Sequence, residues 1–188
     1  MELQKKHDRI ILGIDPGSLN FGYSLIQQDG SQYTLIIKGI LHLQSINDQI
    51  EKNKKIFEFL DELLRTYLFD EIAIEQPVYG KDAQAMLKLG RVLGCCVGFA
   101  VSHKIPITEY LPKNVKKVIT GNGNAAKQQV AYFAARILKT PLESKTYDDT
   151  DAVAIALCHA FNLSGIPTMS SGRSWSQFIK NNPDRIVK

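Results

Sequence analysis

Ile10-Ile-Leu-Gly-Ile-Asp-Pro-Gly-Ser18 is the stretch that decides the fold. Four of the five residues at 10–14 are aliphatic, which predicts a buried strand, and the Pro-Gly pair after it predicts a sharp turn. Proline has no N–H for a strand ladder, and glycine reaches backbone conformations that are closed to other residues. The carboxylate of Asp15 is therefore expected where a buried strand ends, beside space for a ligand.

The same arrangement recurs further along the chain. Glu71-Ile-Ala-Ile-Glu75 is a short apolar strand that is stopped by Gln76-Pro77. A second carboxylate, Glu75, is thereby expected at a strand end. In open α/β sheets, ligands bind at such ends, where the strand order switches.

A third group of acids, Asp148-Asp-Thr-Asp151, opens an alanine-rich helix. Asp148 and Asp151 are three residues apart and should share one face of the first turn. Asp149 points elsewhere and is the expected cap of the helix. The small residues that follow would let this helix pack closely on the sheet and bring its first turn toward Asp15.

The remaining hydrophobic patterns predict an α/β domain. A hairpin signal at Gln28-Asp-Gly-Ser31 makes two flanking strands antiparallel. We expect strands at 10–14, 21–28, 33–43, 71–75 and 105–110, and helices at 48–68, 81–103, 112–120, 124–138 and 147–162. The apolar stripe expected of the first helix consists of Ile50, Phe57, Leu60 and Leu64. This order predicts a ribonuclease H-like fold, with a mixed five-stranded sheet flanked by helices. The nuclease domain is expected at 10–162, between an N-terminal extension at 1–9 and a C-terminal tail at 163–188.

Composition indicates a globular protein of 188 residues with 44% hydrophobic and 22% charged residues. The formal net charge of +4 is uneven: residues 81–139 carry ten Lys or Arg and only two acids, which favours a polyanionic partner. We expect no signal peptide before the first strand, and the apolar stretch 92–102 is too short to span a bilayer. Three cysteines without a zinc or disulfide spacing suit the cytoplasm.

Four carboxylates in one place repel one another unless a cation neutralises them. A set of hard oxygen ligands without His or Cys selects Mg²⁺ or Mn²⁺. Such a set is typical of two-metal phosphodiester hydrolysis, in which one ion activates water and the other stabilises the departing oxygen. With the basic middle segment, the residues by themselves predict a metal-dependent nuclease.

The sequence also resembles a known family, the RuvC family of bacterial Holliday-junction resolvases. The resemblance is carried, in the family's order, by Gly13-Ile-Asp-Pro-Gly-Ser, Ala73-Ile-Glu-Gln, Met86-Leu-Lys-Leu-Gly-Arg, Gly123-Asn-Ala-Ala-Lys-Gln-Gln-Val and Asp148-Asp-Thr-Asp-Ala-Val-Ala-Ile-Ala. It implies a homodimer that binds four-way junction DNA and cuts two opposing strands symmetrically. It also implies two partners, a junction-binding protein and a branch-migration motor.

The resemblance assigns catalysis and metal binding to four residues: Asp15, Glu75, Asp148 and Asp151. The metal would be Mg²⁺, two ions per subunit, with Mn²⁺ able to substitute. Tyr79 is the candidate for an aromatic that disturbs base stacking at the crossover. The expected DNA-binding residues are Tyr79, Lys81, Lys88, Arg91, Lys113, Lys116, Lys117, Lys127 and Lys139.

Three other classes of protein share part of this pattern. A sugar kinase or actin-like ATPase needs a duplicated domain, which 188 residues without an internal repeat do not provide. A non-catalytic junction-binding module would explain the basic segment but not the acids at strand and helix ends. A ribonuclease H-like nuclease acting on RNA precursors would use the same acids and is the closest alternative.

Two further features have open interpretations. Gly121-Asn-Gly-Asn124 precedes a helix with Lys127 in its first turn, which is either a phosphate site of free amides or a plain connection. Gly90, Gly94 and Gly98 recur every four residues in the helix at 81–103, although each costs about 1 kcal/mol relative to alanine. This glycine ridge packs either on the domain's own sheet or on a second subunit.

Overall fold

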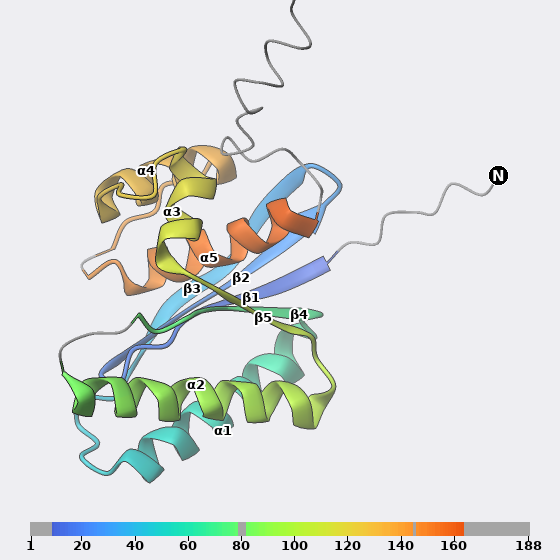
Figure 1. Ribbon diagram of the computed structural model, residues 1–188. Coiled ribbons are helices and arrows are strands. Elements are labelled where there is room, and N and C mark those ends of the chain that lie inside the picture. Colours follow the sequence, from blue (N-terminus) through green and yellow to red (C-terminus); the bar gives the residue numbers. More distant parts are fainter. Residues whose placement is uncertain (1–8, 79–81, 145, 164–188) are drawn as a thin grey trace, which may run out of the picture.

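The structure is a computed structural model that describes residues 9–78, 82–144 and 146–163. It has three layers, in which a central sheet is covered by helices on both faces (Figure 1). The strands are β1 (Arg9–Asp15), β2 (Asn20–Asp29), β3 (Gln32–His42), β4 (Glu71–Glu75) and β5 (Ile107–Tyr110). The helices are α1 (Gln49–Tyr67), α2 (Ala83–His103), α3 (Pro112–Thr120), α4 (Lys127–Leu138) and α5 (Asp148–Leu163).

The five strands form one mixed sheet in the order β3-β2-β1-β4-β5. β2 and β3 are antiparallel neighbours, as the hairpin signal predicted, and Gly30 in the hairpin has a φ of 58°. β1 is antiparallel to β2. β1 and β4 are parallel, and so are β4 and β5. The predicted mixed five-stranded sheet flanked by helices is confirmed, and the carboxyl ends of β1 and β4 lie at the same edge.

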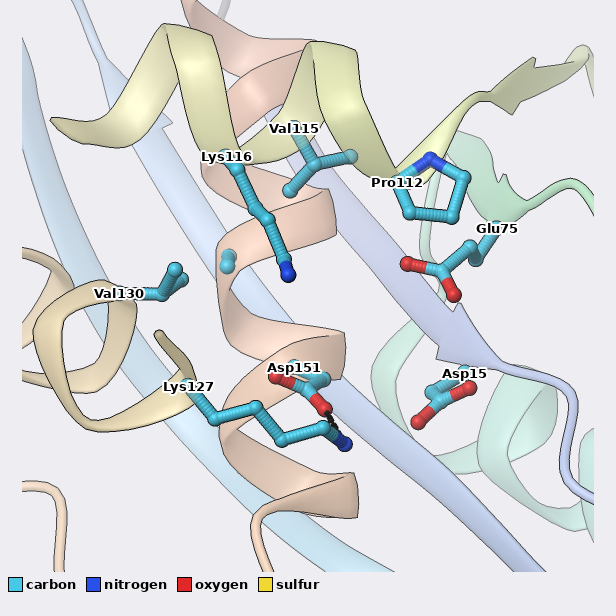
Figure 2. A pocket seen from close by; sticks show the side chains of 9 residues that line it. Asp15, Glu75, Pro112, Val115, Lys116, Lys127, Val130 and Asp151 are labelled. Carbon is cyan, nitrogen blue, oxygen red and sulfur yellow. Dashed lines mark hydrogen bonds and ion pairs between the residues drawn. The ribbon is translucent and has the colours of Figure 1, made fainter. Parts of the chain in front are cut away.

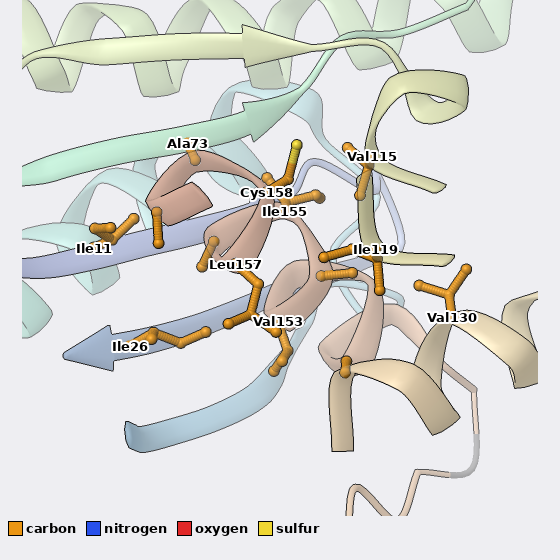
Figure 3. Close-up of a cluster of buried hydrophobic side chains, with 14 of the residues drawn as sticks. Ile11, Ile26, Ala73, Val115, Ile119, Val130, Val153, Ile155, Leu157 and Cys158 are labelled. Carbon is orange, nitrogen blue, oxygen red and sulfur yellow. The ribbon is translucent and has the colours of Figure 1, made fainter. Parts of the chain in front are cut away.

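Two hydrophobic cores fill the spaces between the layers. α1 and α2 cover one face of the sheet, whereas α3, α4 and α5 lie on the other (Figure 1). Alternate residues of β1 serve the two cores, because Ile11 faces the α5 side (Figure 3) and Leu12 faces the side of α1 and α2. The opening apolar run is therefore buried on both faces, as its sequence predicted.

α5 packs unusually close to the sheet, because glycines of β1 and β2 face its backbone. A Cβ atom at Gly13 would lie 2.2 Å from the carbonyl oxygen of Ala152 and 2.8 Å from the Cβ of Ala156. A Cβ atom at Gly22 would lie 2.1 Å from the carbonyl oxygen of Asp148. The expected close approach of the alanine-rich helix is confirmed, and it depends on glycine in the facing strands.

The prediction for the first helix was wrong in detail. The expected apolar stripe was Ile50, Phe57, Leu60 and Leu64, but Ile50 is 75% and Phe57 is 38% exposed. The buried residues of α1 are Lys52, Ile56, Leu60 and Leu63. Lys52 is buried because its aliphatic stem covers the core while its ammonium reaches the carbonyl oxygen of Ser18, at 3.0 Å.

Several predicted boundaries also shift. α2 begins at Ala83 because the Asp82 side chain caps the amides of Gln84 and Ala85, and α4 begins only at Lys127 rather than at 124. β5 begins at Ile107 rather than at 105. Local capping sets the two helix starts, whereas pairing with β4, a tertiary feature, sets the start of β5.

α2 is apolar on more than its buried face. Within the described part of the chain it is the one helix that, by length and composition alone, could cross a membrane. Its most apolar stretch of 18 residues has a mean hydropathy of 1.5, and 22% of that stretch is buried. The expectation concerned only the apolar stretch 92–102, which is shorter than α2. Val92, Cys96, Phe99 and Ala100 pack on the sheet, while Leu87 and Val101 are 53% and 70% exposed.

The contact between Gly13 and α5 leads to a stability prediction. Gly13→Ala would place a methyl group against the backbone of α5, which cannot move aside as a flexible side chain can. We expect a loss of about 3 kcal/mol, at the upper end of overpacking costs, measured by urea unfolding. A Gly13→Ala variant as stable as the wild type would show that α5 does not pack on β1 as described.

Candidate active site

Asp15 and Glu75 lie side by side because their strands are parallel neighbours. Ile14 of β1 is paired with Ile74 of β4, so the next residue of each strand carries a carboxylate at the same edge. The turn after Asp15 is tight: the amide of Gly17 donates to the Asp15 carbonyl oxygen at 2.9 Å. A Cβ atom at Gly17 would lie 1.9 Å from the Asn20 carbonyl oxygen, so only glycine fits there.

Asp151, in the first turn of α5, is the third acid at this edge. A pocket of about 270 Å³ brings the three carboxylates together (Figure 2). Lys116 of α3 and Lys127 of α4 extend into the same pocket, whose apolar wall is formed by Pro112, Val115, Val130 and Ala154. The structure thus places Asp15, Glu75 and Asp151 in one pocket, as the sequence predicted.

The electrostatics of the pocket disfavour ionised carboxylates. Burial, together with the charges of Glu75 and Asp151, raises the pKa of Asp15 from 3.8 to about 8. Burial and the charge of Asp151 raise the pKa of Glu75 from 4.5 to about 7. Burial raises the pKa of Asp151 as well, against the opposing effect of Lys127. A positive charge in this pocket would therefore be strongly stabilised.

Lys127 supplies part of that charge. Its ammonium forms an ion pair with Asp151, with 2.5 Å between Lys127 Nζ and Asp151 Oδ2 (Figure 2). Partial burial acts to lower the pKa of Lys127, but the hydrogen bond and the charge of Asp151 outweigh it and raise the pKa. Lys127 thus belongs to the acidic pocket rather than to a separate phosphate site.

Three backbone amides of the loop before Lys127 already have hydrogen-bond partners. The amide of Asn122 donates to Thr120 Oγ1, that of Asn124 to Asn122 Oδ1, and that of Ala126 to Gln129 Oε1. These three amides are therefore not free donors, and a phosphate site formed by other backbone amides at the start of α4 stays a prediction.

Asp148 lies at the margin of the pocket and is not among the residues that line it. Its charge still contributes to the raised pKa values of Asp15 and Asp151. Asn20 Nδ2 donates to Asp148 Oδ2 at 3.3 Å. The structure therefore distinguishes Asp148 from the three acids that line the pocket. The spacing in the sequence did not predict this difference.

Asp149 has more partners than a helix cap. The expected capping role was wrong: α5 begins at Asp148, and Asp149 accepts from the amide of the next residue, Thr150, whereas a cap accepts from an amide two or three residues ahead. Asp149 also accepts from Lys38 and from the hydroxyl of Ser144. Asp149 is 7% exposed, so its pairing with Lys38 of β3 is a largely buried ion pair. It fixes the start of α5 to the sheet.

The carboxylate oxygens suit a divalent cation, and their raised pKa values show how strongly the site favours a positive charge. Nevertheless, among the described residues no group of three or more His, Cys, Asp or Glu side chains is already gathered tightly enough to hold a metal ion. The three acids share a pocket, but their side chains would have to draw together around a cation.

The expected DNA-binding residues fall in different places. Lys116 and Lys127 lie in the pocket. The other expected DNA-binding residues that the structure describes are exposed on α2, on α3 and at the end of α4, namely Lys88, Arg91, Lys113, Lys117 and Lys139. Tyr79 and Lys81 lie outside the described residues.

Sequence reasoning missed three polar residues around the acids: Asn20, Lys38 and Lys52. Each contacts a segment far away in the chain: Asn20 reaches Asp148, Lys38 reaches Asp149, and Lys52 reaches Ser18. No local pattern could have indicated these contacts, because strand register and helix placement create them.

Comparisons with known proteins agree with this geometry. The family model described as crossover junction endodeoxyribonuclease RuvC matches residues 11–159. A protein of that name from Cytophaga hutchinsonii is 45% identical and covers 97% of this chain and 90% of its own length. Another, from Porphyromonas gingivalis, is 41% identical and covers 95% of this chain and 97% of its own length.

Among solved structures, Thermus thermophilus RuvC in complex with a Holliday-junction substrate is similar with a TM-score of 0.77. It is 26% identical in sequence and covers 84% of this chain and 96% of its own. The predicted ribonuclease H-like fold, and the resemblance stated from the sequence, are thereby confirmed.

The raised pKa values predict how stability depends on pH in chelator-treated protein. Asp15 and Glu75 keep their protons in the folded protein up to about pH 8 and pH 7, whereas an unfolded chain releases them near pH 4. The folded state is therefore destabilised progressively as the pH rises from about 4 to about 8. Asp15→Asn removes one such group, so its stabilising effect should be larger at pH 8 than at pH 5.

Thermal unfolding at both pH values measures this difference, since about 1 kcal/mol moves the Tm by roughly 2–4 °C in a chain of this size. Asp29→Asn, at an exposed carboxylate in the β2–β3 hairpin, is the control and should not show the trend. If Asp15→Asn lowers the Tm more at pH 8 than at pH 5, the acids do not repel one another as described.

Proposed function

This chain belongs to the RuvC family of crossover junction endodeoxyribonucleases, and on that premise we propose that it resolves four-way DNA junctions by metal-dependent hydrolysis of phosphodiester bonds in recombination and repair. The observation that carries the proposal is the pocket in which Asp15, Glu75 and Asp151 meet from β1, β4 and α5. The similar Thermus thermophilus protein is described with a Holliday-junction substrate. Cleavage of RNA precursors, the alternative, is not favoured, because the relatives are named as deoxyribonucleases.

Asp15, Glu75 and Asp151 would hold the metal, with Asp148 joining from the margin. Mg²⁺ is the ion that such oxygen ligands select, two ions per subunit, and Mn²⁺ should substitute. When bound, the ions supply the activated water and the stabilisation of the departing 3′ oxygen. The raised pKa values of the acids support this role, since a cation would offset both their burial and their mutual repulsion.

The pocket lysines would hold the scissile phosphate. Lys116 and Lys127 extend into the pocket opposite Asp15 and Glu75 (Figure 2), so a phosphate entering it meets two ammonium groups as well as the cation site. Residues 111–142 contain no acid, so the α3–α4 wall has a single sign of charge. The exposed basic residues of α2, α3 and α4 would bind the junction arms through phosphate contacts.

We further propose that the enzyme acts as a homodimer through α2. A Cβ atom at Gly90, Gly94 or Gly98 would have no atom within 4 Å outside its own helix and chain neighbours. The interpretation that the glycine ridge packs on the domain's own sheet was therefore wrong. With the exposed Leu87 and Val101, the ridge offers an apolar surface that a second α2 could cover.

A two-fold axis beside α2 would present two pockets to opposite strands of a symmetric junction. The partners implied by the family, a junction-binding protein and a branch-migration motor, would engage the same substrate. A cytoplasmic location, where bacterial DNA is processed, is the setting in which we expect this activity.

Cleavage assays on matched substrates test the activity. Asp15→Asn and Asp151→Asn each keep the side-chain shape but remove a ligand charge, so in Mg²⁺ each should lower junction cleavage by several orders of magnitude. Junction affinity should survive, because the phosphate contacts remain. Asp29→Asn, at the exposed hairpin carboxylate, is the matched control. If the wild type cuts linear duplex or RNA as fast as four-way junctions, the proposed function is wrong.

The homodimer is tested with Gly94→Leu. The helix gains about 0.8 kcal/mol of propensity and the side chain meets open space, so each subunit should stay folded. A second α2 could no longer approach, and light scattering should report a monomer that nicks junctions but makes no paired cuts. Gln128→Leu, exposed on α4, is the control and should leave the oligomeric state unchanged. A Gly94→Leu protein with the wild-type mass in solution would place the interface elsewhere.

A further inference from the structure

Asp148 is connected to the sheet by a short series of side-chain hydrogen bonds. Asn20 Nδ2 donates to Asp148 Oδ2 at 3.3 Å. On the other side of the same amide, Gln44 Nε2 donates to Asn20 Oδ1 at 3.0 Å, and His42 Nδ1 lies 3.2 Å from that oxygen. The amide of Asn20 is thus held from both ends.

The chemistry of the partners determines which way this amide faces. An ionised carboxylate can only accept, so the NH₂ group of Asn20 must face Asp148 and its oxygen must face Gln44 and His42. His42 then has to carry its hydrogen on Nδ1, because the amide oxygen is an acceptor. A flipped amide would set its oxygen against the Asp148 carboxylate and its NH₂ group against the NH₂ group of Gln44, losing both of these bonds.

The backbone places Asn20 for this contact. Asn20 and His42 are direct cross-strand partners in the β2–β3 register, so their side chains share one face of the sheet. Gly22, two residues further on β2 and on the same face, touches the backbone of Asp148. Asn20 therefore lies on the face that α5 covers, at the point where α5 begins.

We infer that Asn20 is a positioning residue for Asp148, holding its carboxylate by Oδ2 at the margin of the pocket, with Gln44 and His42 fixing the amide. The inference rests on the proposed function, because it assigns Asp148 a share in binding the cation. Asp148 contributes to the electrostatics of Asp15 and Asp151 without lining their pocket. A carboxylate at this position needs a partner that fixes its orientation. Loss of a hydrogen bond that orients a metal-binding side chain typically lowers metal affinity or activity 10–100-fold.

Metal binding can be measured apart from cleavage by the Mn²⁺-induced rise in Tm of chelator-treated protein. Asn20→Leu keeps the approximate size but removes the donor. The Mn²⁺ concentration for half of the maximal shift should rise about 10-fold, and junction cleavage should slow by a similar factor, with junction affinity unchanged. Gln49→Ala, which removes an amide hydrogen bond within α1, is the control and should leave both measurements at wild-type values.

A double-mutant cycle distinguishes positioning from a merely structural bond. If Asn20 acts through Asp148, Asn20→Leu should not weaken the Mn²⁺ response further in an Asp148→Asn background. His42 and Gln44 lie at exposed positions, and replacing either one by alanine leaves the other as a donor to Asn20. Each single variant should therefore weaken the Mn²⁺ response less than Asn20→Leu does. The double variant should weaken it nearly as much as Asn20→Leu. This double variant also serves as the test should Asn20→Leu fail to fold.

A wild-type Mn²⁺ response in Asn20→Leu, or an equal loss with and without Asp148, would overturn the inference. A failure of the proposed function looks different. In that case the wild type would not cut junctions, whereas the Mn²⁺ response and its dependence on Asp148 and Asn20 would still be measurable.

Discussion

The close approach of α5 to β1 and β2 is the contact on which the rest of the structure depends. Gly13 and Gly22 provide it, because any side chain at either position would overlap the backbone of α5. Only at this distance does the first turn of α5 bring Asp151 to the strand ends that carry Asp15 and Glu75. The glycines cost strand stability, and alanines on α5 contribute little volume, so the fold gives up part of its core packing to assemble the acids.

The assembled acids in turn work against the stability of the fold. Burial and mutual repulsion raise the pKa values of Asp15 and Glu75 to about 8 and about 7, and the charge of Lys127 offsets only part of this rise. Such a site favours a bound cation, and a metal-dependent nuclease needs a cation at this place. Around it, Lys38, Lys52 and Asn20 fix the start of α5 and the turn after Asp15 by hydrogen bonds from rigid elements.

The two faces of the sheet have separate tasks. α3, α4 and α5 form the pocket, together with the ends of β1 and β4, and contribute its lysines. On the opposite face, α2 packs one side on the core and leaves a glycine ridge and exposed apolar residues on the other. Separation of this kind would let the proposed dimer form through α2 without covering the pockets.

Much of the fold and the central acids could be read from the sequence because their signals are local. An apolar run that ends in Asp-Pro-Gly or Glu-Gln-Pro places a carboxylate at a strand end whatever surrounds it. The parallel pairing of β1 and β4 in the structure then brings Asp15 and Glu75 together. Only the tertiary structure decided that Lys127 turns toward Asp151, that Lys52 is buried, and that the glycine ridge faces outward. It also distinguished Asp148, held by Asn20 at the margin, from Asp151 within the pocket, although both lie on the same turn of one helix. Those outcomes depend on which segments, distant in the chain, come to lie beside each residue, and a pattern within one segment carries no information about its neighbours in space.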